Sequence, residues 1–92
     1  MATVHVPALL RHLSGGAESL HISLPPGERI TVRALLERLS GDYPGLLDGL
    51  LYQDDLMPGI IVIVDNDHAL MGLLAKIEDS SEVRFLPPIV GG

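Results

Sequence analysis

The spacing of apolar residues changes along the chain, and the order of these spacings restricts the fold more than any other feature. Apolar residues alternate with polar ones in 3–8 and 18–24, which is typical of half-buried strands. In 31–43 apolar residues recur at helical spacing, whereas the sequence IIVIV at 60–64 is β-branched and apolar throughout. Alternation returns in 82–86. The order is therefore strand, strand, helix, strand, strand.

Residues between these segments predict where each one starts and ends. The prolines at 25–26 end the second strand, because proline cannot donate to a strand ladder. Thr31 is the expected N-cap of the helix. The sequence at 44–55 predicts a short helical turn, and 68–71 predicts a short additional strand. Asn66 suits the left-handed conformation of a turn.

The first two strands are expected to form a hairpin through Gly15-Gly16, which tolerate the positive φ values of a tight reversal. In the expected register His5 lies opposite His21 on the outer face. Two ligands are too few for a metal site, so no metal role is predicted. The aspartates at 54–55 and at 65 and 67 do not have the spacing of a calcium-binding loop.

Composition narrows the classes of partner. The chain has 92 residues, which suits one domain, and only three aromatic residues, so Leu, Ile and Val must build the core. A formal charge of −6 opposes binding to nucleic acid or anionic lipid and favours a basic protein surface. Cysteine is absent, the first residues do not have the pattern expected of a signal peptide, and no apolar run has the length expected of a membrane span. A soluble, cytoplasmic protein is expected.

These elements predict an α+β fold in which one main helix lies across a mixed sheet of four to five strands. The expected domain is 1–86, followed by an extended tail at 87–92. One face of 60–64 must meet the helix, and the other is either covered by a loop or by the segment LLDGLLYQ, or exposed to a partner. The candidate partner surface comprises Ile61, Ile63, Phe85 and Leu86.

The segment FLPPIVGG at the end of the chain suits insertion into a narrow channel. Gly91 and Gly92 lack Cβ atoms, so this backbone passes where other residues do not fit. The prolines at 87–88 fix φ and reduce the number of conformations that binding must freeze. Ile89 and Val90 can add apolar contacts at the channel mouth. The alternative is an end without function.

The residues VHVPALLRHLSGG, TVRALLERL, IVIVDND and above all SSEVRFLPPIVGG resemble the ubiquitin-like β-grasp sulfur carriers. This family includes the small subunit of molybdopterin synthase, the thiamin-thiazole sulfur carrier and the cysteine-synthesis carrier of actinobacteria. The resemblance covers nearly the whole chain. The Pro-Pro pair and terminal Gly-Gly resemble the molybdopterin type first and the cysteine type second.

The resemblance implies that an ATP-dependent adenylating enzyme activates the Gly92 carboxylate and that sulfur then replaces the adenylate to give a thiocarboxylate. A biosynthetic enzyme, such as the molybdopterin synthase large subunit or a cysteine-synthase-like enzyme, would accept the sulfur. The carrier would bind no cofactor and would not itself be an enzyme, except as the small subunit of a synthase. Two alternatives remain: a protein modifier that forms isopeptide bonds to lysines, and an interaction domain with an inert tail.

Overall fold

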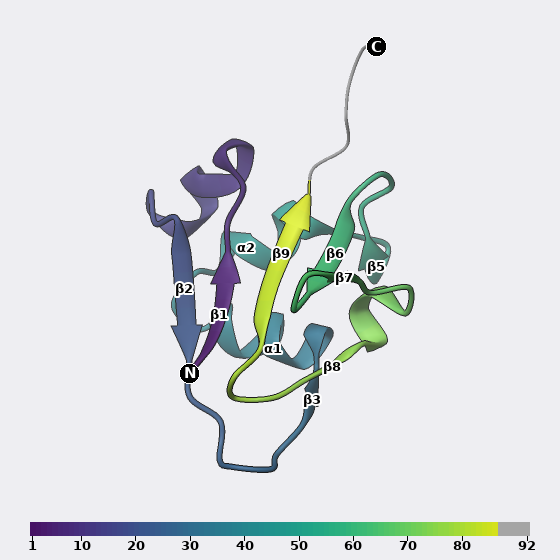
Figure 1. The fold of residues 1–92 in the computed structure, drawn as a ribbon. Coiled ribbons are helices and arrows are strands. Elements are labelled where there is room, and N and C mark those ends of the chain that lie inside the picture. Colours follow the sequence, from purple (N-terminus) through teal and green to yellow (C-terminus); the bar gives the residue numbers. More distant parts are fainter. Residues whose placement is uncertain (87–92) are drawn as a thin grey trace.

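The computed structural model describes residues 1–86, and residues 87–92 lie outside the described part. A five-stranded mixed sheet forms the centre of the molecule, with the strand order β2-β1-β9-β6-β7 (Figure 1). Its strands are β1 (Ala2–His5), β2 (Ser19–Ile22), β6 (Ile61–Val64), β7 (Asp67–His68) and β9 (Glu82–Leu86). The last strand along the chain is thus the middle strand of the sheet.

Helices and short strands surround this sheet. The helices are η1 (Ala8–Ser14), α1 (Val32–Leu39), α2 (Gly45–Leu50) and η2 (Gly72–Leu74). Two small two-stranded ladders pair β3 (Ile30–Thr31) with β8 (Lys76–Ile77) and β4 (Leu51–Tyr52) with β5 (Asp55–Leu56).

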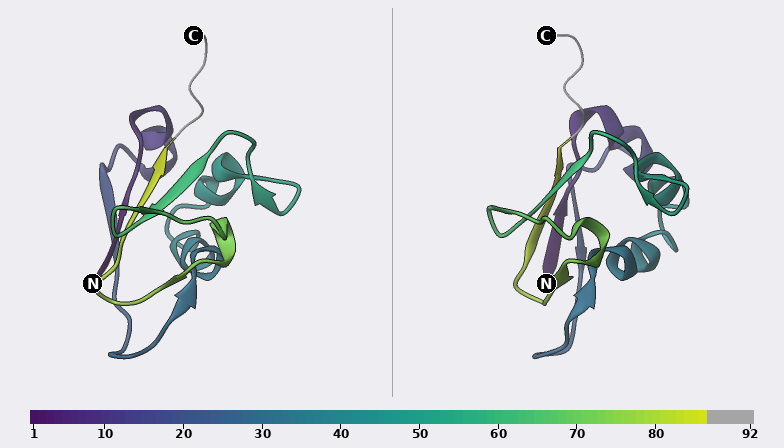
Figure 2. Two further views of the ribbon diagram at one scale, coloured as in Figure 1. Left: turned by 45° about the vertical axis from the view of Figure 1, so that its right-hand side comes forward. Right: turned by 90° about the vertical axis from the view of Figure 1, so that its right-hand side faces the viewer.

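The arrangement of β9 gives the sheet its mixed character. Strand β9 runs parallel to β1 and antiparallel to β6, while β1 and β2 form an antiparallel pair. Both α-helices lie on one side of the sheet and leave its other face uncovered by helices (Figure 2). This is a β-grasp fold, and it confirms the predicted fold class.

The core lies between the sheet and α1. Leu35 and Leu36 of α1 are fully buried, and Val4, Val62 and Val83 of the sheet are at most 1% exposed. Successive residues of a strand point to opposite faces of the sheet, so the residues that face α1 are every second one, and these are apolar. Hydrophobic burial of this kind stabilises the fold by about 1.5–3 kcal/mol for each large side chain.

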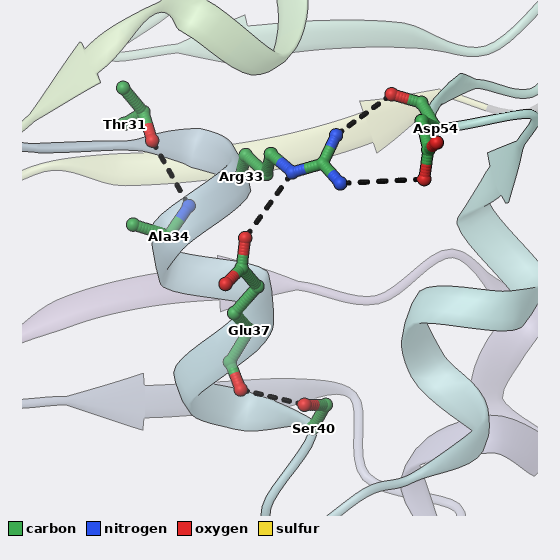
Figure 3. A network of polar contacts seen from close by, with 6 residues as sticks. All are labelled: Thr31, Arg33, Ala34, Glu37, Ser40 and Asp54. Atoms are coloured by element: carbon green, nitrogen blue, oxygen red, sulfur yellow. Dashed lines mark hydrogen bonds and ion pairs between the residues drawn. The ribbon is translucent and has the colours of Figure 1, made fainter.

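Polar contacts fix the start of α1 (Figure 3). Thr31 Oγ1 accepts a hydrogen bond from the backbone N–H of Ala34 at 3.0 Å, which confirms the predicted N-cap. Arg33 Nε pairs with Glu37 at 3.2 Å, and Arg33 Nη1 donates to the Asp54 carbonyl at 2.8 Å. The second contact ties α1 to the turn between β4 and β5.

The predicted register of the first hairpin is wrong. Thr3 lies opposite His21, and His5 lies opposite Ser19, so the two histidines are not paired. Alternating apolarity leaves this ambiguity, because a shift by two residues keeps every side chain on its face. The reversal also differs from a tight turn. The helical residues of η1 make the connection, and Gly15 caps them with φ of 67°.

The other connections largely follow the expectations. The helical turn predicted within 44–55 is α2, and the strand 60–64 is β6, an interior strand. Asn66 has φ of 70°, as predicted for its turn. The short strand expected at 68–71 is wrong in its bounds, since β7 contains Asp67 and His68 alone.

Asp79 joins the two ends of the first hairpin to the segment that leads into β9. Its Oδ1 accepts a hydrogen bond from the Leu24 backbone N–H at 2.9 Å, and its Oδ2 lies 3.2 Å from the Met1 amino group. The Leu24 hydrogen bond is the main cause that lowers the pKa of Asp79 below its ordinary value of 3.8, and the Met1 contact adds to it. The folded state therefore favours the ionised carboxylate.

We expect Asp79→Asn to make stability less sensitive to acid. A group with a lowered folded pKa stabilises the fold above its unfolded pKa, and this contribution is lost as the pH falls through the folded pKa. Urea denaturation at a series of pH values from about 6 to about 2 should show a smaller loss for Asp79→Asn than for the wild type. Asp42→Asn, at an exposed site, is the matched control. Equal pH profiles for all three proteins would contradict this role.

Candidate functional site

The candidate site is the outer face of β9 and β6 at the edge where β9 ends. Leu86, the last described residue, pairs with Ile61, and Arg84 pairs with Ile63. Side chains of paired residues share a face and have Cβ atoms about 4.5–5.5 Å apart. Leu86 is 47% exposed and Ile61 is 39% exposed, whereas Ile63 is half-buried. We call Ile61, Ile63, Arg84 and Leu86 the exit face, since residues 87–92 follow it in sequence.

Phe85 does not belong to this surface, and its assignment to a partner surface is wrong. Its side chain is 3% exposed and lies in the core, opposite Val62 in the strand register. Consecutive strand residues point to opposite faces, so Phe85 and Leu86 cannot both face a partner. The inward position of Val62 likewise settles which face of β6 is outside.

The segment around α2 does not cover the outer face of β6. Leu46 and Leu50 of α2 are buried in the core, and α2 lies on the same side of the sheet as α1 (Figure 2). The segment LLDGLLYQ therefore leaves the outer side chains of β6 uncovered, which agrees with the alternative that this face is exposed to a partner.

A surface pocket of about 280 Å³ opens beside Leu86. Arg11 and Arg84 line it together with His5 and Glu18. Arg11 Nε donates to the Val6 carbonyl at 3.3 Å, which holds the guanidinium against the end of the first strand segment.

Ionisable side chains continue along the outer face of β9. His5 lies opposite Arg84, and His5 Nε2 lies 3.3 Å from Glu82 Oε1. Sequence analysis did not select Arg84, although the alternation of EVRFL already placed it on the same face as Leu86. Arg11 gave no such signal, because its position in the pocket depends on η1.

The other predicted residues fall outside the described part of the chain. These are Pro87, Pro88, Ile89, Val90, Gly91 and Gly92. Within residues 1–86, no three His, Asp or Glu side chains are grouped so that they could hold a metal ion. In the same range, none of the helices has the length and apolar character of a membrane span.

Comparisons with known proteins agree with this geometry. The ThiS family model matches residues 4–92. A chain of the Amycolatopsis orientalis BexX/CysO complex is 26% identical, with a TM-score of 0.85 and full coverage of both chains. Small archaeal modifier protein 1 (SAMP1) of Methanosarcina acetivorans is 29% identical, with a TM-score of 0.74 and coverage of 99% of this chain and 95% of that chain. Urm1 of Trypanosoma brucei is 26% identical, with a TM-score of 0.70 and coverage of 99% and 94%.

A comparison with curated proteins gave no match. The family match covers nearly the whole chain, and the chain belongs to the ThiS family. Its fold is that of the ubiquitin-like sulfur carriers, as the sequence resemblance implied.

The two faces of β9 predict that two neighbouring substitutions change the stability by very different amounts. Phe85→Ala should lower the free energy of unfolding by about 3–5 kcal/mol, because it leaves a cavity in the core. Leu86→Ala removes an exposed side chain and should change the free energy of unfolding by no more than about 0.5 kcal/mol. Urea denaturation measures both. A Leu86→Ala variant as unstable as Phe85→Ala would contradict the assignment of faces.

Proposed function

We propose that this protein is a sulfur carrier whose Gly92 carboxylate is adenylated and then converted to a thiocarboxylate. Membership of the ThiS family over residues 4–92 is the observation that carries the proposal. The fold supports it, because β9 ends at an exposed apolar face and the six residues of PPIVGG follow directly.

The proposed chemistry needs little from the carrier. A carboxylate oxygen of Gly92 attacks the α-phosphorus of ATP, and pyrophosphate leaves. A sulfur donor at the oxidation level of hydrosulfide then attacks the acyl carbon, AMP leaves, and the carbonyl keeps the new C–S bond. The adenylating enzyme supplies ATP and the catalytic groups. The carrier contributes a reactive end and a surface that positions it, so we propose that it is a substrate protein and not an enzyme.

Two kinds of partner follow from this proposal. The first is an adenylating enzyme, and the second is a biosynthetic enzyme that accepts the sulfur. The structural match to a chain of the BexX/CysO complex supports a carrier that forms complexes with other proteins. The pair Pro87-Pro88 favours the molybdopterin type of acceptor over the cysteine type, and sulfur transfer to both purified acceptors distinguishes the two.

A protein modifier is the second candidate. The 29% identity to SAMP1, a small archaeal modifier protein, favours it. In that role a target lysine amine would attack the same acyl adenylate, and AMP would leave as an isopeptide bond forms. Conjugates of higher mass in which Gly92 is joined to a lysine amine would identify the modifier, whereas a stable thiocarboxylate identifies the carrier.

We expect the intact protein to gain the mass of one oxygen-to-sulfur exchange when it is incubated with ATP, a sulfide source and the adenylating enzyme of the same organism. Mass spectrometry should place the change on Gly92, and omission of ATP should abolish it. A variant without Gly91 and Gly92 should gain no sulfur. A variant with one alanine added after Gly92 is the matched control, because it keeps both glycines but displaces the carboxylate. An unchanged mass with an active enzyme would contradict the proposal.

A further inference from the structure

The chain is acidic overall, and its basic side chains differ in whether an ion pair neutralises them. The formal charge is −6, with twelve acidic and six basic residues. Three arginines are neutralised by ion pairs away from the exit face: Arg29 with Glu78 at 3.9 Å, Arg33 with Glu37 at 3.2 Å, and Arg38 with Glu28 at 3.3 Å.

Arg84 differs from these three arginines. Within residues 1–86, no carboxylate oxygen lies within 4.0 Å of its guanidinium. The nearest acid along its strand face is Glu82, whose Oε1 is directed to His5 at 3.3 Å. Glu18 is in the wall of the pocket that Arg84 also lines, without an ion pair to it. The exit face therefore presents a cation in an otherwise acidic protein.

Apolar side chains flank this cation on the side of β6 and towards Leu86, whereas His5 of β1 and Glu82 lie on its other sides. Ile63 is its direct cross-strand neighbour, and Leu86 lies two residues further on the same face of β9. Ile61 extends the apolar surface beside Leu86. A partner that covers these side chains removes water from Arg84, and an ion pair is stronger where water is excluded. The planar guanidinium matches a carboxylate with two parallel hydrogen bonds.

The length of the remaining chain limits how far from this face a partner that holds Gly92 can bind. Six residues follow Leu86, and a fully extended segment of that length spans at most about 20 Å. A standard interface buries about 800 Å² on each protein, which corresponds to a disc of roughly 16 Å radius. An enzyme that holds Gly92 therefore contacts the domain near Leu86, and the exit face lies within that reach.

We propose that Arg84 receives an Asp or Glu side chain of the adenylating enzyme, seated among Ile61, Ile63 and Leu86. This inference rests on the proposed function and adds the chemistry of the partner surface. The net charge alone suggests that the whole docking surface of the partner is basic. The exit face instead requires a surface with an apolar centre and a carboxylate, so basic residues of the partner belong at its periphery.

The test compares binding of Arg84→Gln and Arg84→Glu with binding of Lys76→Gln and Lys76→Glu. Lys76 is an exposed residue of β8 with no carboxylate within 4.0 Å in residues 1–86. Its substitutions change the net charge by the same amounts as those of Arg84, but in a different sheet. Calorimetry with the purified adenylating enzyme should show about tenfold weaker binding for Arg84→Gln and a larger loss for Arg84→Glu. The Lys76 variants should bind within about twofold of the wild type.

A charge exchange separates a direct ion pair from an indirect effect. Acidic residues at the enzyme surface are replaced by lysine one at a time, and one replacement should restore binding of Arg84→Glu. Restoration by none of them would overturn the ion pair. Thermal unfolding of each variant provides the control for folding, and we expect unchanged midpoints because Arg84 is exposed.

The outcomes distinguish this inference from the proposed function. If the wild type gains sulfur but the Arg84 variants bind like the Lys76 variants, the docking is apolar alone and the inference is wrong. If the wild type neither binds the enzyme nor gains sulfur, the proposed function fails and the inference fails with it.

Discussion

The placement of the last strand in the middle of the sheet is the constraint on which the rest of the structure depends. Strand β9 forms ladders with β1 on one side and β6 on the other, so the sheet is not continuous without it. The pairs with β1 join residues 3–5 to residues 82–84, and the entropy of closing so long a loop must be offset by the contacts that β9 makes. Folding of the whole domain is thus coupled to the segment that precedes PPIVGG.

The alternation of β9 divides stability from recognition. Its inward side chains, Val83 and Phe85, are buried beneath α1, whereas Arg84 and Leu86 face outward. Because the two sets point in opposite directions, the outer set is free to vary with the partner while the core stays intact. Members of one fold family can in this way serve different enzymes.

The sequence predicted the elements better than their mutual placement. Thr31 and the helical spacing after it identified α1 because capping and amphipathicity are local properties. The register of β1 with β2 failed because alternation is unchanged by a shift of two residues. The short ladder of β3 with β8 could not be predicted from the sequence, because its paired residues Thr31 and Lys76 are 45 positions apart in the chain.

For the candidate site, too, local features could be predicted from the sequence and the placement of distant residues could not. IIVIV is apolar on both faces, so only the burial of Val62 in the folded protein shows that Ile61 and Ile63 are outside. The outward position of Arg84 could be predicted, because it is two residues before Leu86 in the same strand and therefore lies on the same face. Its lack of an ion pair within residues 1–86 could not be predicted, because the positions of distant carboxylates depend on the complete fold.

Methyl NMR of the complex with the adenylating enzyme tests most directly whether the exit face is the surface that a partner covers. Leu74, which is 62% exposed and belongs to η2, is the internal control. We expect the methyl signals of Ile61, Ile63 and Leu86 to shift or broaden on binding while those of Leu74 do not. Changes at Leu74, with the exit face unaffected, would contradict this docking surface.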